Sequence, residues 1–84
     1  MKSVIVDKVN RFSISTNEEK RYFISIPVSN PYVDYEEHYE ISKREFEQYI
    51  EDTNLALEFV KECKDHKHDE LLLEKPGKYR GIAT

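Results

Sequence analysis

The chain of 84 residues contains only one cysteine, two glycines and three prolines. The lone Cys63 cannot form a disulfide within the chain, so covalent cross-linking does not stabilise the fold. Low-complexity linkers are absent, and the length predicts a single domain over residues 1–84. No apolar run approaches the roughly 20 residues that cross a membrane, and the apolar run at residues 4–6 is too short for a signal peptide. We therefore expect a soluble, cytoplasmic protein with no membrane partner.

The charges are unevenly distributed along the chain. The formal net charge is −4, yet residues 34–62 alone hold ten acidic and three basic side chains. Such an acidic block repels phosphate backbones, so we expect no direct nucleic-acid partner. It favours a basic protein partner through electrostatic steering. The alternative interpretation is a solvated acidic helix that keeps the domain soluble.

Apolar residues make up 38% of the chain, which is too many for a disordered segment. Residues 3–15 are rich in β-branched side chains and predict a strand, with a bulge or break near Lys8 where the alternation fails. After a polar connector, residues 22–28 alternate with an apolar face. A turn signal at residues 29–31 follows, and residues 34–41 resume as a third strand.

The stretch NPYVDYEEHYEI, residues 30–41, concentrates three tyrosines and four carboxylates and contains no Lys or Arg. In a strand, its side chains alternate between two faces. One face holds Tyr35, Glu37, Tyr39 and Ile41. That face can join a core at its Ile41 end. The other face holds Glu36, His38 and Glu40, and it is either solvated or in contact with a partner.

A helix is predicted to begin at Ser42, because Ser42 and Glu45 have the spacing of a capping box ahead of an apolar run. Apolar or small side chains then recur at helical spacing. The stripe comprises Phe46, Tyr49, Ile50, Thr53, Leu57 and Val60, flanked by Ala56 and Cys63.

Leu55 and Phe59 do not fit this stripe, since they fall on the opposite face of a straight helix. Either the helix breaks within residues 51–54, where Asp52 and Asn54 are good cap residues, or two large apolar side chains are exposed. We favour a break that buries both.

Leu71–Leu73 predict a short strand after the helix. Pro76-Gly77 predicts a type II turn into a final basic segment that could add a short edge strand. The resulting order, β-β-β-α-β with hairpin-length links, predicts an α+β fold. We expect a small antiparallel sheet covered on one face by one long or broken helix.

No segment contains a recognisable catalytic or cofactor motif. Cys63 and His66 have a spacing that could activate a thiolate, but a lone Cys near a helix end is more often a small core residue. His66 and His68 could hold zinc together with a carboxylate. The competing interpretation places these histidines against the negative end of the helix dipole. We predict no metal site and no cofactor.

Two further sets of residues suggest chemistry only weakly. Glu36, His38 and Glu40 are residue types that can act as general acids and bases, but a domain of this size seldom encloses a catalytic cleft. Tyr79 lies among basic residues and could stack on a nucleobase, although nearby acids balance that charge. We therefore predict that the protein is not an enzyme.

Protein recognition remains, and the acidic, tyrosine-rich stretch favours it. Tyrosine is enriched at interfaces because it adds contact area and a polar tip with little loss of rotamer freedom. Carboxylates around it suit a basic target, such as the active cleft of a nuclease, where they would lie in place of phosphates. The alternative is that these tyrosines cap the core and the carboxylates are solvated. The predicted partner-binding residues are Tyr32, Asp34, Tyr35, Glu36, Glu37, His38, Tyr39 and Glu40.

In size, charge and α+β pattern, and in SNPYVDYEEHYEIS and DELLLEKPGKYRG, the chain resembles the immunity proteins of bacterial polymorphic-toxin and contact-dependent growth-inhibition systems. That resemblance implies a non-catalytic inhibitor that binds one cognate toxin by direct occlusion, and we expect this toxin to be a nuclease with a basic active cleft. The resemblance assigns no role to any individual residue of this chain. The alternative is a small regulatory or phage-encoded protein-binding module without a toxin partner. We expect a monomer in either case.

Overall fold

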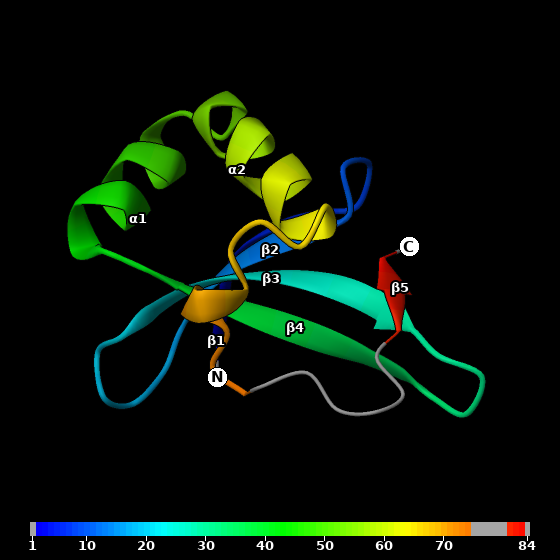
Figure 1. Ribbon diagram of the computed structural model, residues 1–84. Helices are drawn as coiled ribbons and strands as arrows, with labels where there is room; N and C mark the ends of the chain where they lie inside the picture. Colours follow the sequence, from blue (N-terminus) through cyan, green and yellow to red (C-terminus); the bar gives the residue numbers. More distant parts are fainter. Residues whose placement is uncertain (1, 75–80, 84) are drawn as a thin grey trace.

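The computed structural model describes residues 2–74 and 81–83, and these residues form an antiparallel sheet and two helices (Figure 1). The strands are β1 (Lys2–Asp7), β2 (Phe12–Thr16), β3 (Tyr22–Ser29), β4 (Asp34–Ile41) and β5 (Ile82–Ala83). The helices are α1 (Lys43–Glu51) and α2 (Asn54–Lys64), followed by a short 3-10 helix, η1 (Asp69–Leu71). Both α-helices lie over the same face of the sheet, so the α+β class is confirmed.

Four strands lie in the order β1-β2-β3-β4, each antiparallel to the next. Because β4 pairs along the whole of β3, the short β5 occupies the other edge of β3, beyond the point where β2 pairing ends at Ser25. The expected C-terminal edge strand is therefore present. The turn predicted at Pro76-Gly77 lies outside the described residues.

The predicted order β-β-β-α-β is wrong, because the structure has β-β-β-β-α-α before the 3-10 helix and β5. Residues 3–15 form a hairpin: the break predicted near Lys8 is present as a turn over residues 8–11, and the chain reverses there instead of continuing as one strand. Asp7 Oδ1 accepts hydrogen bonds from the backbone N–H groups of Val9, at 3.0 Å, and Asn10, at 2.9 Å. Arg11 completes the turn with a φ of 60°. An aspartate that bonds the following backbone in this way stabilises a tight turn.

The helical region begins and breaks where its cap residues predict. Ser42 Oγ accepts from the N–H of Glu45 at 3.1 Å, and the Glu45 carboxylate accepts from the N–H of Ser42 at 3.0 Å. This is the predicted capping box. Asp52 and Thr53 separate α1 from α2, and Asp52 Oδ1 accepts from the N–H of Asn54 at 3.1 Å. The predicted helix break is confirmed.

The break has different consequences for Leu55 and Phe59. The Phe59 ring is partly buried, 4.7 Å from the His68 ring and 6.3 Å from the Tyr49 ring. Leu55 stays 55% exposed, so the expected burial of both is wrong for Leu55. The face of α2 that meets the sheet is marked by its buried residues Ala56, Val60 and Cys63. At ~100° per residue, Phe59 lies nearer the centre of that face than Leu55 does.

The short strand predicted at Leu71–Leu73 is not formed. Its first residue belongs to η1, which tightens the backbone and leaves little of the segment extended. Leu72 makes a single bridge with Tyr39, and the Leu73 N–H donates to the carbonyl of His38 at 2.8 Å. The segment still protects the outer edge of β4, as the predicted strand would have done.

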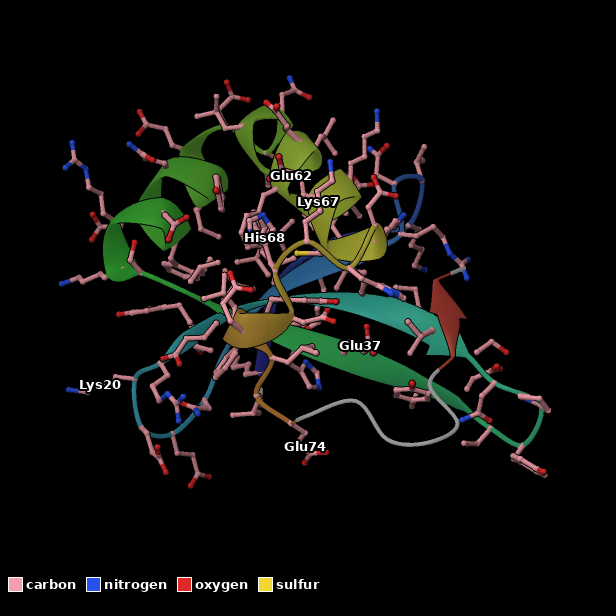
Figure 2. The ribbon with its side chains drawn as sticks, viewed as in Figure 1. Lys20, Glu37, Glu62, Lys67, His68 and Glu74 are labelled. Carbon is pink, nitrogen blue, oxygen red and sulfur yellow. The ribbon has the colours of Figure 1, made fainter. Side chains whose placement is uncertain are left out.

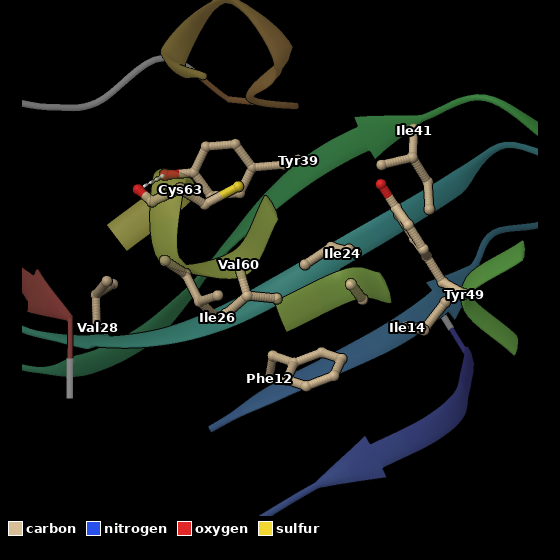
Figure 3. Packing of buried hydrophobic residues seen from close by; sticks show 11 residues of the cluster. Phe12, Ile14, Ile24, Ile26, Val28, Tyr39, Ile41, Tyr49, Val60 and Cys63 are labelled. Carbon is tan, nitrogen blue, oxygen red and sulfur yellow. Dashed lines mark hydrogen bonds between the residues drawn. The ribbon is translucent and has the colours of Figure 1, made fainter. Parts of the chain in front are cut away.

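The core lies between the sheet and the helices (Figure 3). Its buried members are Phe12, Ile14, Ile24, Ile26, Val28, Tyr39, Ile41, Tyr49, Ala56, Val60 and Cys63. Each large aliphatic or aromatic side chain removed from water stabilises the fold by about 1.5–3 kcal/mol. As the sequence indicated, Cys63 is a small core residue at the end of α2.

The opposite face of the sheet, which we call the open face, has no helix over it in the described chain (Figure 1). Small buried side chains from β2 and β3 line its centre: Ser13, Ser15 and Ser25. Phe23 is buried on this face, with the Arg21 guanidinium 5.6 Å above its ring. A groove of about 390 Å³ runs over Ser13 and Ser25 toward Pro27 and Glu36.

Candidate functional site

The alternation of β4 divides the acidic, tyrosine-rich stretch between two environments. Tyr35, Glu37, Tyr39 and Ile41 point toward the helices, and Glu36, His38 and Glu40 point to the open face, as the sequence indicated. The burial on the helix side extends further than expected, from Ile41 back to Glu37. The eight predicted partner-binding residues therefore do not share one surface.

Glu37 and Tyr39 are part of the protein interior. Tyr39 is fully covered, and its hydroxyl lies 3.0 Å from Glu37 Oε1 and 3.1 Å from the carbonyl oxygen of Cys63. One hydroxyl proton is shared between these two acceptors. Glu37, labelled on β4 in Figure 2, is also buried: its exposed fraction is only 6%. Neither side chain can contact a partner in this fold, so we remove both from the candidate interface.

The Tyr35 side chain connects β4 to the residue that directly precedes β5. Its hydroxyl accepts a hydrogen bond from the backbone N–H of Gly81 at 2.8 Å. A side chain at Gly81 could not be accommodated, because a Cβ there would lie 2.6 Å from the carbonyl oxygen of Ser29. Tyr35 is half-buried by this arrangement and is better explained by its structural contact than by partner binding.

Glu40 is held by Arg21 on the open face. The carboxylate accepts from Arg21 Nε at 2.8 Å and from Nη2 at 2.6 Å, a two-pronged geometry that suits a planar guanidinium. These hydrogen bonds hold the pKa of Glu40 below its usual value and raise that of Arg21. In the free protein, Arg21 therefore already neutralises much of the negative charge of Glu40.

His38 pairs with a serine on the neighbouring strand. Its Nδ1 lies 2.5 Å from Ser25 Oγ, a contact that a nucleophile and its general base would also make. Ser25 is only 1% exposed, however, and nucleophilic attack requires an accessible oxygen. We interpret the pair as a cross-strand hydrogen bond that holds the His38 ring against the sheet.

The remaining predicted residues, Tyr32, Asp34 and Glu36, are exposed at the β3–β4 hairpin. With Val33 they form what we call the hairpin tip, in which Tyr32 is 76% exposed. Sequence reasoning missed Val33, although its place two residues after Pro31 of the turn signal could have indicated exposure.

Asn30 fixes the shape of the hairpin tip. Its side-chain oxygen accepts from the backbone N–H groups of Tyr32 and Val33, both at 2.8 Å, and its own N–H donates to the Val33 carbonyl at 3.1 Å. An asparagine turn of this kind orders the backbone without tertiary contacts. The exposed aromatic and acidic side chains are therefore presented on an ordered loop.

The possible nucleophile and metal ligands elsewhere have other roles. Burial raises the pKa of the Cys63 thiol to about 12, with a further contribution from the Glu62 carboxylate. His68 Nε2 lies 2.8 Å from Glu62 Oε1 (Figure 2). His66 is exposed at a φ of 61°. Among residues 2–74 and 81–83, no group of three or more His, Cys, Asp or Glu side chains is arranged to hold a metal ion.

Neither α-helix, nor any other helix in the described part of the chain, is long and apolar enough to cross a membrane. No protein-family model, curated protein or solved structure matches this chain. The case for a function therefore rests on the hairpin tip and the charges around it.

Proposed function

We propose that this protein is an immunity protein that binds and neutralises a cognate toxin by direct occlusion, with the hairpin tip as its main contact. The observation that carries the proposal is the presentation of Tyr32 beside Asp34 and Glu36 on a loop ordered by Asn30. Exposed aromatic residues are frequent energetic anchors of protein interfaces. An ordered loop loses little conformational entropy when it binds, so more of the contact energy appears as affinity.

Charge supports a basic partner. The block from residue 34 to 62 has a formal net charge of −7, and Asp34 and Glu36 are the exposed carboxylates nearest to Tyr32 in the chain. Glu36 also lines the groove of the open face, but so do Lys8 and Arg11, so the attraction for a basic partner is assigned to the hairpin tip and not to the groove. A nuclease cleft offers basic side chains because it binds phosphate, and carboxylates placed there would exclude the substrate.

The alternative is a small regulatory or phage-encoded module that binds a protein other than a toxin. The same surface would serve it, since an ordered aromatic and acidic tip recognises basic chemistry and not a particular activity. The two functions differ only in what happens to the partner after binding. Loss of toxin activity on binding favours the first, and binding without any loss of activity favours the second.

The test uses the product of the gene adjacent to the one encoding this protein. We expect that product to bind the purified protein and to lose its nuclease activity when the two are mixed in equal amounts. Tyr32→Ala should raise the dissociation constant by about thirtyfold or more, as for an anchor residue. Leu55→Ala, which shortens another exposed apolar side chain, should change it by less than about twofold. A product that neither binds nor loses activity would overturn the immunity function.

A further inference from the structure

The two outer edges of the four-stranded sheet differ in how far other described segments of the chain cover them. The edge of β4 is partly covered, because Leu72 bridges to Tyr39 and Leu73 bonds His38. The edge of β1 has no neighbouring strand among the described residues, and Figure 3 shows β1 outermost beside β2. An edge strand of this kind presents backbone N–H and C=O groups to any strand that can approach it.

The side chains of β1 are more apolar than an unprotected edge usually allows. Val4 and Val6 are both exposed, Val6 at 60%, and the charged residues of the strand stand at its two ends, Lys2 and Asp7. Open edges are commonly protected by charges in their middle, by proline or by a β-bulge. The middle of β1 has no charge and no proline, so among the described residues the bulge at Val4 is its main protection of this kind. A second strand can pair with this edge only in a register that accommodates the bulge.

A bulge determines which side chains of β1 share a face. Ser3 pairs with Ser15 but Ile5 pairs with Ile14, so Val4 is the extra residue. Ile5 packs against the core and therefore points to the helix side of the sheet. Side chains alternate along the strand, and Val4 does not count in this alternation because it is the extra residue of the bulge. Ser3 and Val6, which flank Ile5 in the alternation, therefore point to the open face. Lys2 and Asp7, one position further out, point to the helix side.

We propose that β1 pairs antiparallel with β1 of a second copy of this chain, about a two-fold axis at Ile5. In that register Ile5 faces Ile5 of the second copy. Ser3 then faces Val6 of the second copy, and Lys2 faces its Asp7. Every pair joins side chains on the same face of the sheet, which an antiparallel ladder requires. Opposite charges meet at both ends of the ladder, and the sequence of β1 is thus complementary to itself.

The same geometry limits the assembly to two copies. A two-fold axis uses both β1 edges at once, and the edges that remain outermost are those of β4, where Leu72 and Leu73 already pair. The ladder is only six residues long, so it buries less than the ~1,000 Å² expected of a strong interface. The dimer is therefore weak. The monomer favoured by the sequence remains the dominant form in dilute solution.

β1 and β4 stand at opposite ends of the strand order, although Glu36 of the hairpin tip lines the groove of the open face together with Ser3 and Val6 of β1. Tyr32 and Asp34 do not line that groove. Dimerisation through β1 therefore leaves Tyr32 and Asp34 accessible, and a partner can bind each copy. The dimer does not depend on the proposed immunity function, since it needs no toxin.

Sedimentation equilibrium of the purified chain tests the dimer. The apparent mass should rise from 10.0 kDa toward twice that value as the concentration increases from roughly 10 µM to 1 mM. Val6→Lys should raise the dissociation constant at least about tenfold, because it places a charge in the middle of the ladder. Val9→Lys, at an 89% exposed position in the adjacent turn, should change it less than about twofold. Far-ultraviolet circular dichroism checks that both variants are folded.

Amide hydrogen exchange identifies the surface. Exchange of the β1 backbone in the wild-type chain should slow as the concentration rises, while exchange in the hairpin tip should not change. A mass that stays at 10.0 kDa up to 1 mM would overturn the proposal. So would a dimer whose β1 amides are not slowed, or a Val6→Lys variant that associates as tightly as the wild type.

Discussion

The hydroxyl of Tyr39 lies 3.0 Å from a carboxylate oxygen of Glu37, and both side chains are buried beneath the end of α2. This contact divides a stretch that looks uniformly acidic and aromatic in the sequence. One part of it stabilises the fold, and the other part, around Tyr32, is left to interact with a partner.

Removing the Tyr39 hydroxyl should destabilise the fold. Tyr39→Phe keeps the ring but leaves Glu37 and the Cys63 carbonyl with one donor fewer, and a buried group that loses its partner costs about 1–3 kcal/mol. Chemical denaturation measures the change in the free energy of unfolding. Tyr32→Phe, the same substitution at an exposed site, should alter it by less than about 0.5 kcal/mol. Equal values for the two variants would contradict the structural role of Tyr39.

The ion pair between Arg21 and Glu40 should make stability depend on acid pH. The Arg21 hydrogen bonds lower the pKa of Glu40 in the folded protein from its ordinary 4.5. The stabilisation is therefore complete above pH 4.5 and is lost as the pH falls through the lower, folded-state pKa. The stability difference between the wild type and Glu40→Gln should be constant near neutral pH and shrink on acidification. Glu36→Gln, on the same face of β4, is the control. A Glu40→Gln difference that does not change with pH would show that the pair contributes nothing.

Phe59 and Leu55 stand one turn apart on α2, but only Phe59 contributes to the packing. Phe59→Ala removes a ring that packs beside Tyr49 and His68, and it should lower the free energy of unfolding by about 2–4 kcal/mol. Leu55→Ala should lower it by less than about 1 kcal/mol, because the side chain is mostly in water. Urea denaturation of the two variants distinguishes these values, and a reversed order would mean that α2 packs with another face.

Cys63 should not react in the folded protein. Its thiol is buried at the end of α2, and burial raises its pKa to about 12, so almost no thiolate exists at pH 8. Iodoacetamide should leave the native protein unmodified for hours and label it within minutes in 6 M guanidinium, an order-of-magnitude contrast. Rapid labelling without denaturant would indicate that the end of α2 opens readily.

Much of the fold follows from local patterns in the sequence. The alternation in β3 and β4, the capping box at Ser42 and the break at Asp52 each depend on neighbouring residues, so they could be predicted. The hairpin within residues 3–15 was missed because it depends on hydrogen bonds from Asp7 to the backbone that follows it. The failed alternation near Lys8 marked an interruption at the turn, but it did not indicate that the chain reverses there, since no glycine or proline occurs in residues 3–15.

The candidate site was only partly predictable for a different reason. Alternation correctly assigned Glu37 and Tyr39 to the face of Ile41, but it gave no measure of how far α2 would extend over that face. The position of Cys63 above Tyr39 is set by the helix break and the strand pairing together. Likewise, the partner of Glu40 is 19 residues away in the chain, and only the β3–β4 register brings Arg21 beside it. Long-range contacts of this kind determine which acidic residues remain exposed.

The kinetics of toxin binding test the central claim most directly. The association rate of this protein with the product of the adjacent gene is measured over a range of salt concentrations, for the wild type and for Asp34→Asn/Glu36→Gln. The account predicts that the double variant associates at least about tenfold more slowly at low salt and with a weaker salt dependence, because exposed charges steer association. Glu18→Gln/Glu74→Gln, which removes two exposed carboxylates away from the hairpin tip, should associate as the wild type does. An Asp34→Asn/Glu36→Gln variant with the rate and salt dependence of the wild type would contradict the assignment of the hairpin tip as the binding surface.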